Sequence, residues 1–413
     1  MRAMKDSGVE CIGKIPYGKN VLRNKYLLEY VKGKLPQSTN LNKEGLPYIG
    51  ATYLDTDKDE DIYTTDINLP DAIKEDLLVL WDGARAGLVG RNKEGKISST
   101  IVRIRGNKNT IYQPFLYWYY KGFEEYMYQC VGGTTIPHMN RKYIEDIGFI
   151  DWTISEQIKL TSYLDTKCSK IDAIIEKQQA VIEKLKEYKL SIITEAVTKG
   201  LNPDVEMKYS GVDWIGEVPK HWDVSTMKRY CRVNQGLQIA QDDRFFESGE
   251  NRYVYITVKY LNSNKKDVAE YIHNPPINTI CNKDDLLMAR TGATGNLVTN
   301  IEGCFHNNFF KINYNKAFFV KDFLVYYFLQ DTIKSYLHLL AGTTTIPDLN
   351  HDDFYTTPIL LPPLLEQETI VKFLNVKCNF IEDVIKKKKK VIEKFTEYKK
   401  SLIYEVVTGK KEV

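Results

Sequence analysis

Glycine-rich turns are the first places where this chain of 413 residues could hold a phosphate group. Gly83-Ala-Arg-Ala-Gly87 and Gly292-Ala-Thr-Gly295 have suitably small residues, but neither continues into the Gly-Lys-Ser/Thr of a nucleotide-binding loop. Nuclease chemistry needs clustered acids near a lysine in a strand context, and Asp59-Glu-Asp61 fits a solvated turn better. The sequence therefore supports neither nucleotide hydrolysis nor nuclease activity.

One short motif points to base modification. Asn274-Pro-Pro-Ile277 is close to the Asn-Pro-Pro-aromatic motif with which amino-methyltransferases hold the amino group of a target base. Ile277 replaces the aromatic ring that would stack on the base, and no glycine-rich strand-to-helix turn for S-adenosylmethionine accompanies the motif. The motif alone gives weak support for a methyltransferase.

The cysteines and histidines give no pattern of metal ligands. Seven scattered cysteines without a Cys-x-x-Cys pair are typical of reduced, apolar side chains. The six histidines show no His-Glu-x-x-His or comparable spacing. We therefore predict no catalytic, metal-binding or cofactor-binding residue in this chain.

Two related loops present small hydroxyl groups. They occupy residues 132–140 and 342–350, share a Gly-Thr-Thr core and an Ile-Pro step, and each follows an aromatic stretch expected to be one helix, at 113–130 and 321–340. Hydroxyls and backbone amides in such a turn can bind phosphates, whereas the alternative is a turn that only joins helix to strand. The predicted DNA contacts from these loops are Thr134, Thr135, Asn140, Thr343, Thr344, Thr345 and Asn350.

Basic residues lie where turns interrupt the expected strands. Arginine can read guanine bidentately, with about 1–3 kcal/mol of discrimination, and lysine neutralises phosphate. For any one of these residues a solvated surface charge is the simpler explanation, but a set at matched turns favours DNA. The predicted contacts from this set are Arg85, Arg91, Lys93, Lys259 and Arg290, and the neighbouring Thr291 is predicted to contact DNA as well.

These loops must be positioned by two copies of one long helix, expected at 154–199 and 364–409. Glu156-Gln157 returns as Glu366-Gln367, and about 20 of 44 aligned positions are identical at a shift of 210 residues. This identity indicates an internal duplication. Because neither run has a proline or glycine inside, about 45 residues make a helix of roughly 68 Å.

Apolar residues in both copies recur at alternating spacings of four and three, with Gln178 and Lys388 at matching places. This heptad pattern is typical of a helix that packs against a partner helix. We predict that the copies pair as an antiparallel coiled coil, and the alternative is that each helix packs on its own globular domain. The predicted seam consists of Leu164, Ile171, Ile175, Ile182, Leu185, Leu374, Ile381, Ile385, Ile392 and Phe395.

The duplication extends beyond the helices, since the leader at 7–16 matches residues 210–219, whereas 55–109 and 262–315 have little in common. Short apolar runs, 77–81 and 254–261 among them, predict strands, and 144–152 and 355–361 are expected to be strand-like. The fold class is therefore α+β, with internal pseudo-twofold symmetry. The predicted divisions are a first globular domain at 1–152, a helix at 153–200, a second globular domain at 201–362 and a helix at 363–413.

Composition places few limits on function. The chain has 57 basic and 54 acidic residues, a net charge of +3 that neither requires nor excludes nucleic acid. No run approaches the ~18 apolar residues of a membrane span, and the first ten residues lack the apolar segment of a signal peptide. We expect a cytoplasmic protein with no membrane association.

The repeated pattern resembles the specificity subunit of a type I restriction-modification enzyme. The resemblance is carried by the doubled leader, the Gly-Thr-Thr loops, and the helices that end in Tyr188-Lys-x-Ser and Tyr398-Lys-x-Ser. Leu361-Pro-Pro-Leu-x-Glu-Gln367 is the family's usual entry to the helix, but Ile150-Asp-Trp-Thr-x-x-Glu-Gln157 lacks the prolines. The start of the first long helix is therefore less well defined than that of the second.

The resemblance implies a non-catalytic DNA reader of bacterial defence, with two target-recognition domains for a bipartite, asymmetric site on double-stranded DNA. It also implies two methyltransferase (modification) subunits that dock on the helices and bind S-adenosylmethionine, and restriction subunits that use ATP and Mg. The helix length would then set the unread gap between the two half-sites. A bivalent protein-binding scaffold and a solitary DNA methyltransferase are the alternatives.

Overall fold

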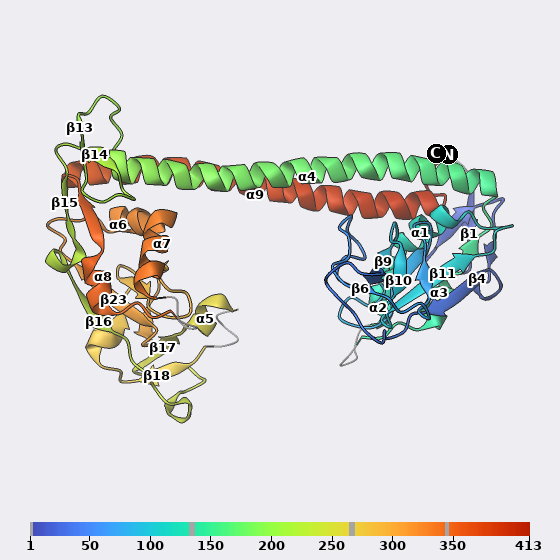
Figure 1. Ribbon diagram of the computed structural model, residues 1–413, viewed down its shortest axis with the longest axis horizontal. Helices are drawn as coiled ribbons and strands as arrows, with labels where there is room; N and C mark the ends of the chain where they lie inside the picture. The colour runs from blue at the N-terminus through green and yellow to red at the C-terminus, as the bar shows by residue number, and fades with distance from the viewer. Residues whose placement is uncertain (1–2, 132–136, 264–268, 343–346) are drawn as a thin grey trace. The chain divides into compact units, whose positions relative to one another are not determined.

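The computed structural model describes residues 3–131, 137–263, 269–342 and 347–413 (Figure 1). Packing divides the chain into a first unit, residues 1–179 with 388–413, and a second unit, residues 180–387. The long helices α4 (Ile154–Lys199) and α9 (Leu364–Val407) begin within one residue of the predicted positions, and each contributes one half to each unit. The boundaries between the two units fall at residues 179/180 and 387/388, inside α4 and α9. The domains predicted from the sequence instead treat each long helix as a separate segment.

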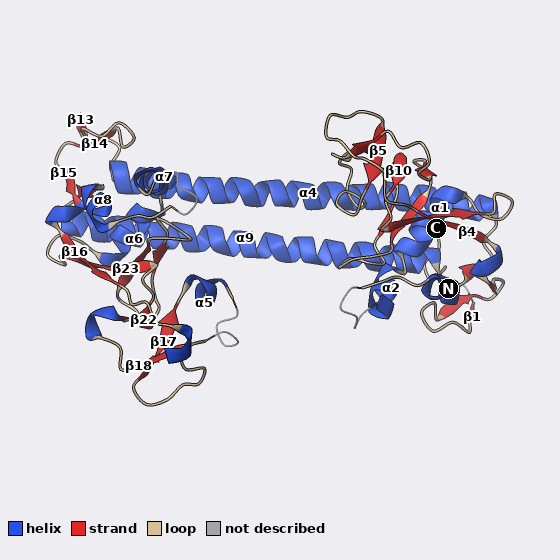
Figure 2. Cartoon of the chain, turned by 60° about the horizontal axis from the view of Figure 1, so that its bottom comes forward, coloured by secondary structure: helices blue, strands red, loops and turns tan. Residues whose placement is uncertain are grey.

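The globular part of the first unit is built on two small sheets (Figure 2). One is antiparallel in the order β4-β11-β8-β9, and the other has the order β6-β5-β10-β7 with β5 and β10 parallel. The strands are β4 (Leu28–Lys32), β5 (Leu46–Ile49), β6 (Tyr63–Thr64), β7 (Asp71–Ala72), β8 (Leu77–Leu80), β9 (Val89–Gly90), β10 (Gly95–Ile97) and β11 (Ile101–Gly106).

The second unit repeats both sheets, in the orders β16-β23-β20-β21 and β18-β17-β22-β19, with β17 and β22 parallel. The strands are β16 (Cys231–Gln235), β17 (Arg252–Ile256), β18 (Tyr271–His273), β19 (Ile280–Cys281), β20 (Leu286–Ala289), β21 (Leu297–Val298), β22 (Gly303–Phe305) and β23 (Phe309–Tyr314). Segments with almost unrelated sequences therefore fold with one topology.

One glycine in each unit permits the parallel strand pair. A Cβ on Gly95 would lie 2.3 Å from the carbonyl oxygen of Pro47, and a Cβ on Gly303 would lie 2.3 Å from that of Val254. Both glycines have φ +148°, which L side chains rarely adopt. A glycine is needed here because the neighbouring backbone approaches so closely.

Short strands and helices complete each unit in the same order. The first unit has β1 (Met4–Asp6) paired with β2 (Lys14–Pro16), β3 (Val21–Leu22) paired with β12 (Phe149–Ile150), the 3-10 turn η1 (Asn24–Tyr26), and the helices α1 (Gln113–Lys121), α2 (Glu124–Val131) and α3 (Arg141–Ile147). The second has β13 (Met207–Tyr209) with β14 (Glu217–Pro219), β15 (Asp223–Thr226) with β24 (Pro358–Leu361), the 3-10 turns η2 (Met227–Arg229), η3 (Gln241–Asp243) and η4 (Ile277–Thr279), and the helices α5 (Val258–Asn262), α6 (Lys321–Leu329), α7 (Asp331–Leu340) and α8 (His351–Thr356).

Several sequence expectations about these elements were wrong. Each aromatic stretch that was expected to be one helix forms two, α1 and α2 in the first unit and α6 and α7 in the second. Gly122 follows α1, and a Cβ added there would lie 2.9 Å from the side chain of Val407. Residues 144–147 are the end of α3 rather than strand, because Asn140 caps that helix. Residues 258–261 belong to α5, whose N-cap Thr257 accepts a bond from the amide of Tyr260.

The two long helices pair antiparallel within each unit, which confirms the predicted fold. In the first unit Lys399 binds Asp172 at 2.6 Å and Lys388 donates to Gln178 at 3.0 Å. In the second unit Lys189 of α4 forms an ion pair with Glu382 of α9. All ten predicted seam residues are buried or half-buried. Among the described residues, no helix is both long and apolar enough to span a bilayer.

Candidate nucleic-acid interface and its attachment to the helices

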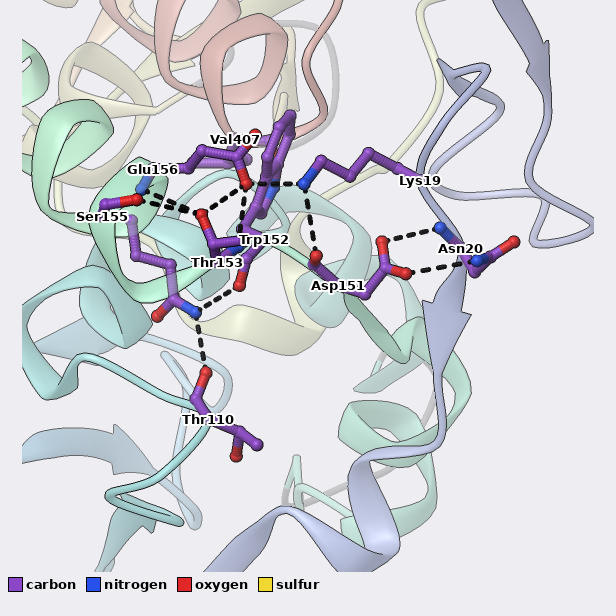
Figure 3. Close-up of polar contacts among 10 residues, drawn as sticks. Lys19, Asn20, Thr110, Asp151, Trp152, Thr153, Ser155, Glu156 and Val407 are labelled. Atoms are coloured by element: carbon purple, nitrogen blue, oxygen red, sulfur yellow. Dashed lines mark hydrogen bonds and ion pairs between the residues drawn. The ribbon is translucent and has the colours of Figure 1, made fainter.

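The repeated glutamine near the start of each long helix is a structural residue. Gln157 is fully buried, and its amide oxygen accepts from the backbone N–H of Tyr112 at 2.8 Å. Its amide nitrogen donates to the carbonyl oxygens of Thr110 and Trp152, both at 2.8 Å (Figure 3). The side chain thereby ties the helix to the loop that leads into α1.

Gln367 makes the same three bonds in the second unit. Its amide oxygen accepts from the N–H of Val320 at 2.9 Å, and its nitrogen donates to the carbonyls of Phe318 at 2.7 Å and Pro362 at 2.9 Å. Sequence reasoning noted this glutamine only as a mark of the duplication. Two of its three partners, Val320 and Phe318, lie 47 and 49 residues away along the chain, so no local pattern reveals its role.

The first long helix begins with a capping box rather than with the prolines of the second. The N–H of Thr153 donates to Glu156 at 2.8 Å, and the N–H of Glu156 donates to the Thr153 hydroxyl at 3.3 Å (Figure 3). Lys19 also binds Glu156, at 2.5 Å. The two bonds give partners to the backbone N–H groups of Thr153 and Glu156 at the start of the helix. The first long helix can therefore begin without the prolines that precede the second.

The end of α9 closes the first unit against the N-terminal leader. The indole N–H of Trp152 donates to the carbonyl oxygen of Val407 at 3.0 Å. The hydroxyl of Tyr404 donates to the carbonyl oxygen of Ile12 at 3.0 Å. Lys410 donates to the same Ile12 carbonyl at 2.8 Å. Residues almost 400 positions apart in the sequence therefore share one core.

Arg85 and Arg290 lie in corresponding turns, as the sequence predicted, but at different positions, since Arg290 matches Trp81. Each follows the last buried strand residues of its central sheet, β8 or β20, and each pairs with one surface carboxylate. Arg85 binds Asp55 at 3.2 Å, and Arg290 binds Asp348 through both carboxylate oxygens. Their side chains remain 46% and 30% exposed. Both guanidinium groups are therefore accessible from outside while held in a fixed direction.

Arg91 and Lys93 are engaged in the fold. Arg91 binds Asp165 of α4 at 2.8 Å, and its guanidinium lies over the rings of Tyr117 and Trp118 at 4.3 and 4.6 Å. Lys93 is 7% exposed and donates to the carbonyl of Lys58. These contacts give both residues a structural role, and their predicted contact with DNA remains a prediction.

The other predicted contacts divide into three groups. Lys259 is exposed on α5, and Thr291 is half-buried after β20. Asn140 and Asn350 cap α3 and α8 by accepting from the amides of Lys142 and Asp353. Thr134, Thr135, Thr343, Thr344 and Thr345 lie outside the described residues.

A side-chain contact that the sequence did not suggest holds residue 138 in the first unit and residue 348 in the second. In the first unit His138 binds Asp82, which also binds Lys32 at 3.0 Å. In the second unit Asp348 occupies the position of His138 and binds Arg290. Arg290 matches Trp81, because the N–H groups of Met139 and Leu349 donate to the carbonyls of Trp81 and Arg290 respectively. The two contacts therefore join the same loop to the same turn through residues that are not all equivalent.

The cysteines are free thiols, and five of the seven are buried. Burial raises the pKa of Cys168 to about 11 and that of Cys281 to about 12, so both stay protonated and apolar at neutral pH. Among the described residues, no group of three or more His, Cys, Asp or Glu side chains could hold a metal ion.

The acidic run at residues 59–61 is only partly solvated, which corrects the sequence interpretation. Glu60 is 7% exposed, and its Oε1 is buried without a hydrogen-bond partner. Burial raises the pKa of Glu60 to about 7, against smaller opposing contributions from the Gly50 amide and the Lys93 ammonium. A carboxylate at this position therefore destabilises the folded first unit when it ionises.

Glu60→Gln is expected to stabilise the first unit above pH 7 and to change little at pH 5. A carboxyl whose folded pKa is raised from 4.5 to about 7 supports folding at low pH, and that support is lost as the pH rises through this window. The expected gain is about 1–3 kcal/mol at pH 8. Urea unfolding at pH 5 and pH 8 measures it, and an equal effect at both pH values would contradict this cause.

Comparison with known proteins agrees with this doubled architecture. The family model described as "Type I restriction modification DNA specificity domain" matches residues 16–184 and again residues 219–394. The chain is 26% identical over 417 residues to the type I restriction enzyme MjaVIII specificity subunit of Methanocaldococcus jannaschii, covering 96% of this chain and 94% of that protein. It is 25% identical over 427 residues to the putative MjaX specificity subunit of the same organism, covering 97% and 95%.

Solved structures share the fold. A chain described under "Structural basis underlying complex assembly and conformational transition of the type I R-M system" superposes with a TM-score of 0.72 at 13% identity, covering 95% of this chain and 98% of that chain. The HsdS subunit from Thermoanaerobacter tengcongensis superposes with a TM-score of 0.50 at 14% identity, covering 96% and 98%. With one family match on each repeat, the chain belongs to the family of type I restriction-modification DNA specificity subunits.

Proposed function

We propose that this chain recognises a bipartite, asymmetric site on double-stranded DNA through its two globular parts and carries methyltransferase subunits on its long helices. The observation that carries the proposal is one strand order built twice, from segments with little sequence in common. Both globular parts have the same strand order, but the side chains on those strands and loops differ between them. Two domains that recognise different half-sites need the same backbone fold with different surface residues.

Arg85 and Arg290 are the side chains best placed to contact DNA. Each is held by a surface carboxylate and partly exposed, so that it can exchange this partner for a phosphate or a guanine edge. Lys259, exposed on α5, would add neutralisation of phosphate in the second unit. The two units would then present basic side chains at different positions on the same framework of strands.

The chain would act as a non-catalytic subunit. In the methyltransferase-like motif, Ile277 stands in place of the stacking aromatic ring and is 87% exposed, and Asn274 adopts a left-handed backbone conformation and contacts His273. S-adenosylmethionine would be bound by the methyltransferase subunits, two per chain, and ATP and Mg by restriction subunits.

A salt titration tests DNA recognition. We expect the affinity of the chain, assembled with its methyltransferase subunits, for its DNA site to fall steeply with salt, with a log-log slope of about −0.9 per phosphate contact. With about six contacts, the affinity falls by roughly a thousandfold between 50 and 200 mM salt. Fluorescence anisotropy on labelled duplex measures the slope. A slope near zero would favour a scaffold that binds proteins.

Inserting four residues after Gln178 and four after Lys388 is expected to lengthen the unread gap of the DNA site by one or two base pairs. Gln178 and Lys388 are bonded partners, so the insertions extend both helices at the same level. Four residues add about 6 Å of helix, and one base pair spans about 3.4 Å.

Methylation mapping in cells that carry the complete system measures the gap. The control replaces the exposed residues Glu176, Lys177, Lys386 and Lys387 by alanine, which changes neither the length of the helices nor their seam. A gap that stays unchanged in the insertion variant would contradict the idea that helix length sets the spacing.

A further inference from the structure

The backbone of Arg290, directly after β20, is anchored by three hydrogen bonds. Its N–H donates to the carbonyl oxygen of Asn308 at 2.7 Å, and its carbonyl oxygen accepts from the N–H of Leu349 at 3.1 Å. The hydroxyl of the buried Thr294 donates to the same carbonyl oxygen at 3.0 Å. The Cα of Arg290 therefore has a fixed position, from which its side chain extends.

The side chain of Arg290 is held along one edge. Its Nε donates to Oδ1 of Asp348, and its Nη2 donates to Oδ2 at 2.7 Å. Among the residues that the structure describes, Nη1 has no hydrogen-bond partner. One N–H of Nη1 and the second N–H of Nη2 therefore form a pair of parallel donors at the end of the guanidinium. The side chain is 30% exposed, so a ligand can approach this donor pair.

Arg85 is held differently, and the difference separates the two arginines. Its Nη1 donates to both carboxylate oxygens of Asp55, at 3.2 and 3.3 Å, and its Nη2 donates to the carbonyl oxygen of Ala51 at 2.5 Å. Both terminal nitrogens are therefore engaged within the protein. Arg85 must break bonds before its end can bind a ligand, whereas Arg290 can bind one while it keeps Asp348.

The surroundings of Arg290 are acidic. A hollow of about 320 Å³ beside it has a lining that includes His351, Asp352 and Asp353. Burial lowers the pKa of His351, so this imidazole adds no positive charge at neutral pH. Together with Asp348, three carboxylates lie near one guanidinium, and they repel a phosphate group. A neutral ligand that presents two acceptors side by side fits this donor pair better.

We propose that Arg290 reads the guanine of one G·C base pair in the major groove while it stays bound to Asp348. This inference rests on the proposed function and narrows it to one residue and one base. Guanine O6 and N7 are the neutral acceptors that a guanidinium binds bidentately in DNA. Asp348 acts as a positioning residue, because its two bonds fix the plane of the guanidinium.

The first unit has a different kind of residue at this position. Trp81 matches Arg290, since the N–H of Met139 donates to the Trp81 carbonyl as the N–H of Leu349 donates to the Arg290 carbonyl. Trp81 is 8% exposed, and an indole has a single N–H donor. The proposed guanine contact therefore belongs to one half of the DNA site, which distinguishes that half from the other.

The test compares R290K, D348N and K259M in the full-length chain, assembled with the methyltransferase subunits of its own system. Lysine keeps the positive charge of Arg290 but lacks the planar donor pair. Asparagine keeps the shape of Asp348 but offers one acceptor oxygen in place of two. Lys259 is the matched control, because it is an exposed cation on α5 beside the same turn, where a Cβ on Gly292 would lie 3.6 Å from Val258.

Methylation mapping gives the recognised site, and competition binding then measures the affinity of each complex for duplexes in which each G·C pair in turn is replaced by A·T. We expect the unaltered complex to lose about tenfold to a hundredfold in affinity at the pair that Arg290 reads. R290K should lose less than about threefold at that pair and keep its discrimination elsewhere. D348N should reduce discrimination at the same pair by a smaller factor, and K259M should weaken binding to all duplexes alike.

Unchanged discrimination at every base pair in R290K would overturn the inference, and so would a recognised site without a specified G·C pair. A uniform loss of affinity in R290K, with base preferences retained, would identify Arg290 as a phosphate contact and overturn the assignment of guanine. If R290K does not assemble with its partners, unchanged discrimination in D348N has the same consequence. An unaltered complex that methylates no bipartite site would instead overturn the proposed function itself.

Discussion

Gln157→Leu is expected to destabilise the first unit by roughly 3–9 kcal/mol. The buried amide satisfies the N–H of Tyr112 and the carbonyls of Thr110 and Trp152. Leucine has a similar size but leaves three backbone groups unpaired, and each buried group without a partner costs about 1–3 kcal/mol. The start of α4 would then lose its attachment to the loop before α1.

Hydrogen exchange of the Tyr112 amide measures the effect directly, since that N–H is the donor to Gln157. The Val320 amide, which donates to Gln367, is the internal control in the same sample. Gln367→Leu should give the reverse pattern. Exchange that accelerates equally at both amides would indicate global unfolding and contradict the local role assigned to Gln157.

Arg105→Leu is expected to cost about 3–5 kcal/mol, because it leaves a buried carboxylate without its counter-charge. Arg105 binds Asp76 through two bonds of 2.6 and 2.7 Å, and the Asp76 side chain is 1% exposed. The hydrogen bond to Asp76 raises the pKa of Arg105, as a strongly held guanidinium requires. Urea unfolding followed by exchange in strands β8 and β11 measures the loss.

The second unit supplies a comparison, because Asp285 corresponds to Asp76 but is paired with a lysine from another position of the neighbouring strand, which also donates to the Ile280 carbonyl at 2.9 Å. Lys311 lies 3.7 Å from Asp285, whose side chain is 29% exposed. Lys311→Leu is therefore expected to cost about 1 kcal/mol or less from loss of the ion pair, because water still solvates the carboxylate. The double variant R105L D76N should recover part of the R105L loss. Equal losses at both sites would show that burial of the acid does not set the cost.

The heptad spacing of α4 and α9 was sufficient to predict the helix pair. An apolar seam on a long, otherwise charged helix can be buried only against a similar seam, and the duplication supplies that partner within the same chain. The shared strand order of the globular parts could not be predicted in the same way. Strands as short as Tyr63–Thr64 and Ile280–Cys281 contain a single period of the strand alternation, too little to identify a strand from sequence.

The candidate DNA contacts show the same limit. Arg85 and Arg290 were found from their positions after buried strands, which is a local signal. Arg91 shares that signal, yet it binds Asp165, a residue 74 positions away. A basic residue at a turn has the same appearance in the sequence whether it faces solvent or a distant carboxylate.

The amino-acid sequence by itself determined the duplicated plan, the paired helices and the family, because these depend on periodicity and on matches along the chain. The tertiary structure alone decided which polar residues hold the fold and which remain available. That division depends on partners far away in sequence, such as Trp152 with Val407 and Arg105 with Asp76. Burial of these polar groups is stable only when such partners meet, and only folding brings them together.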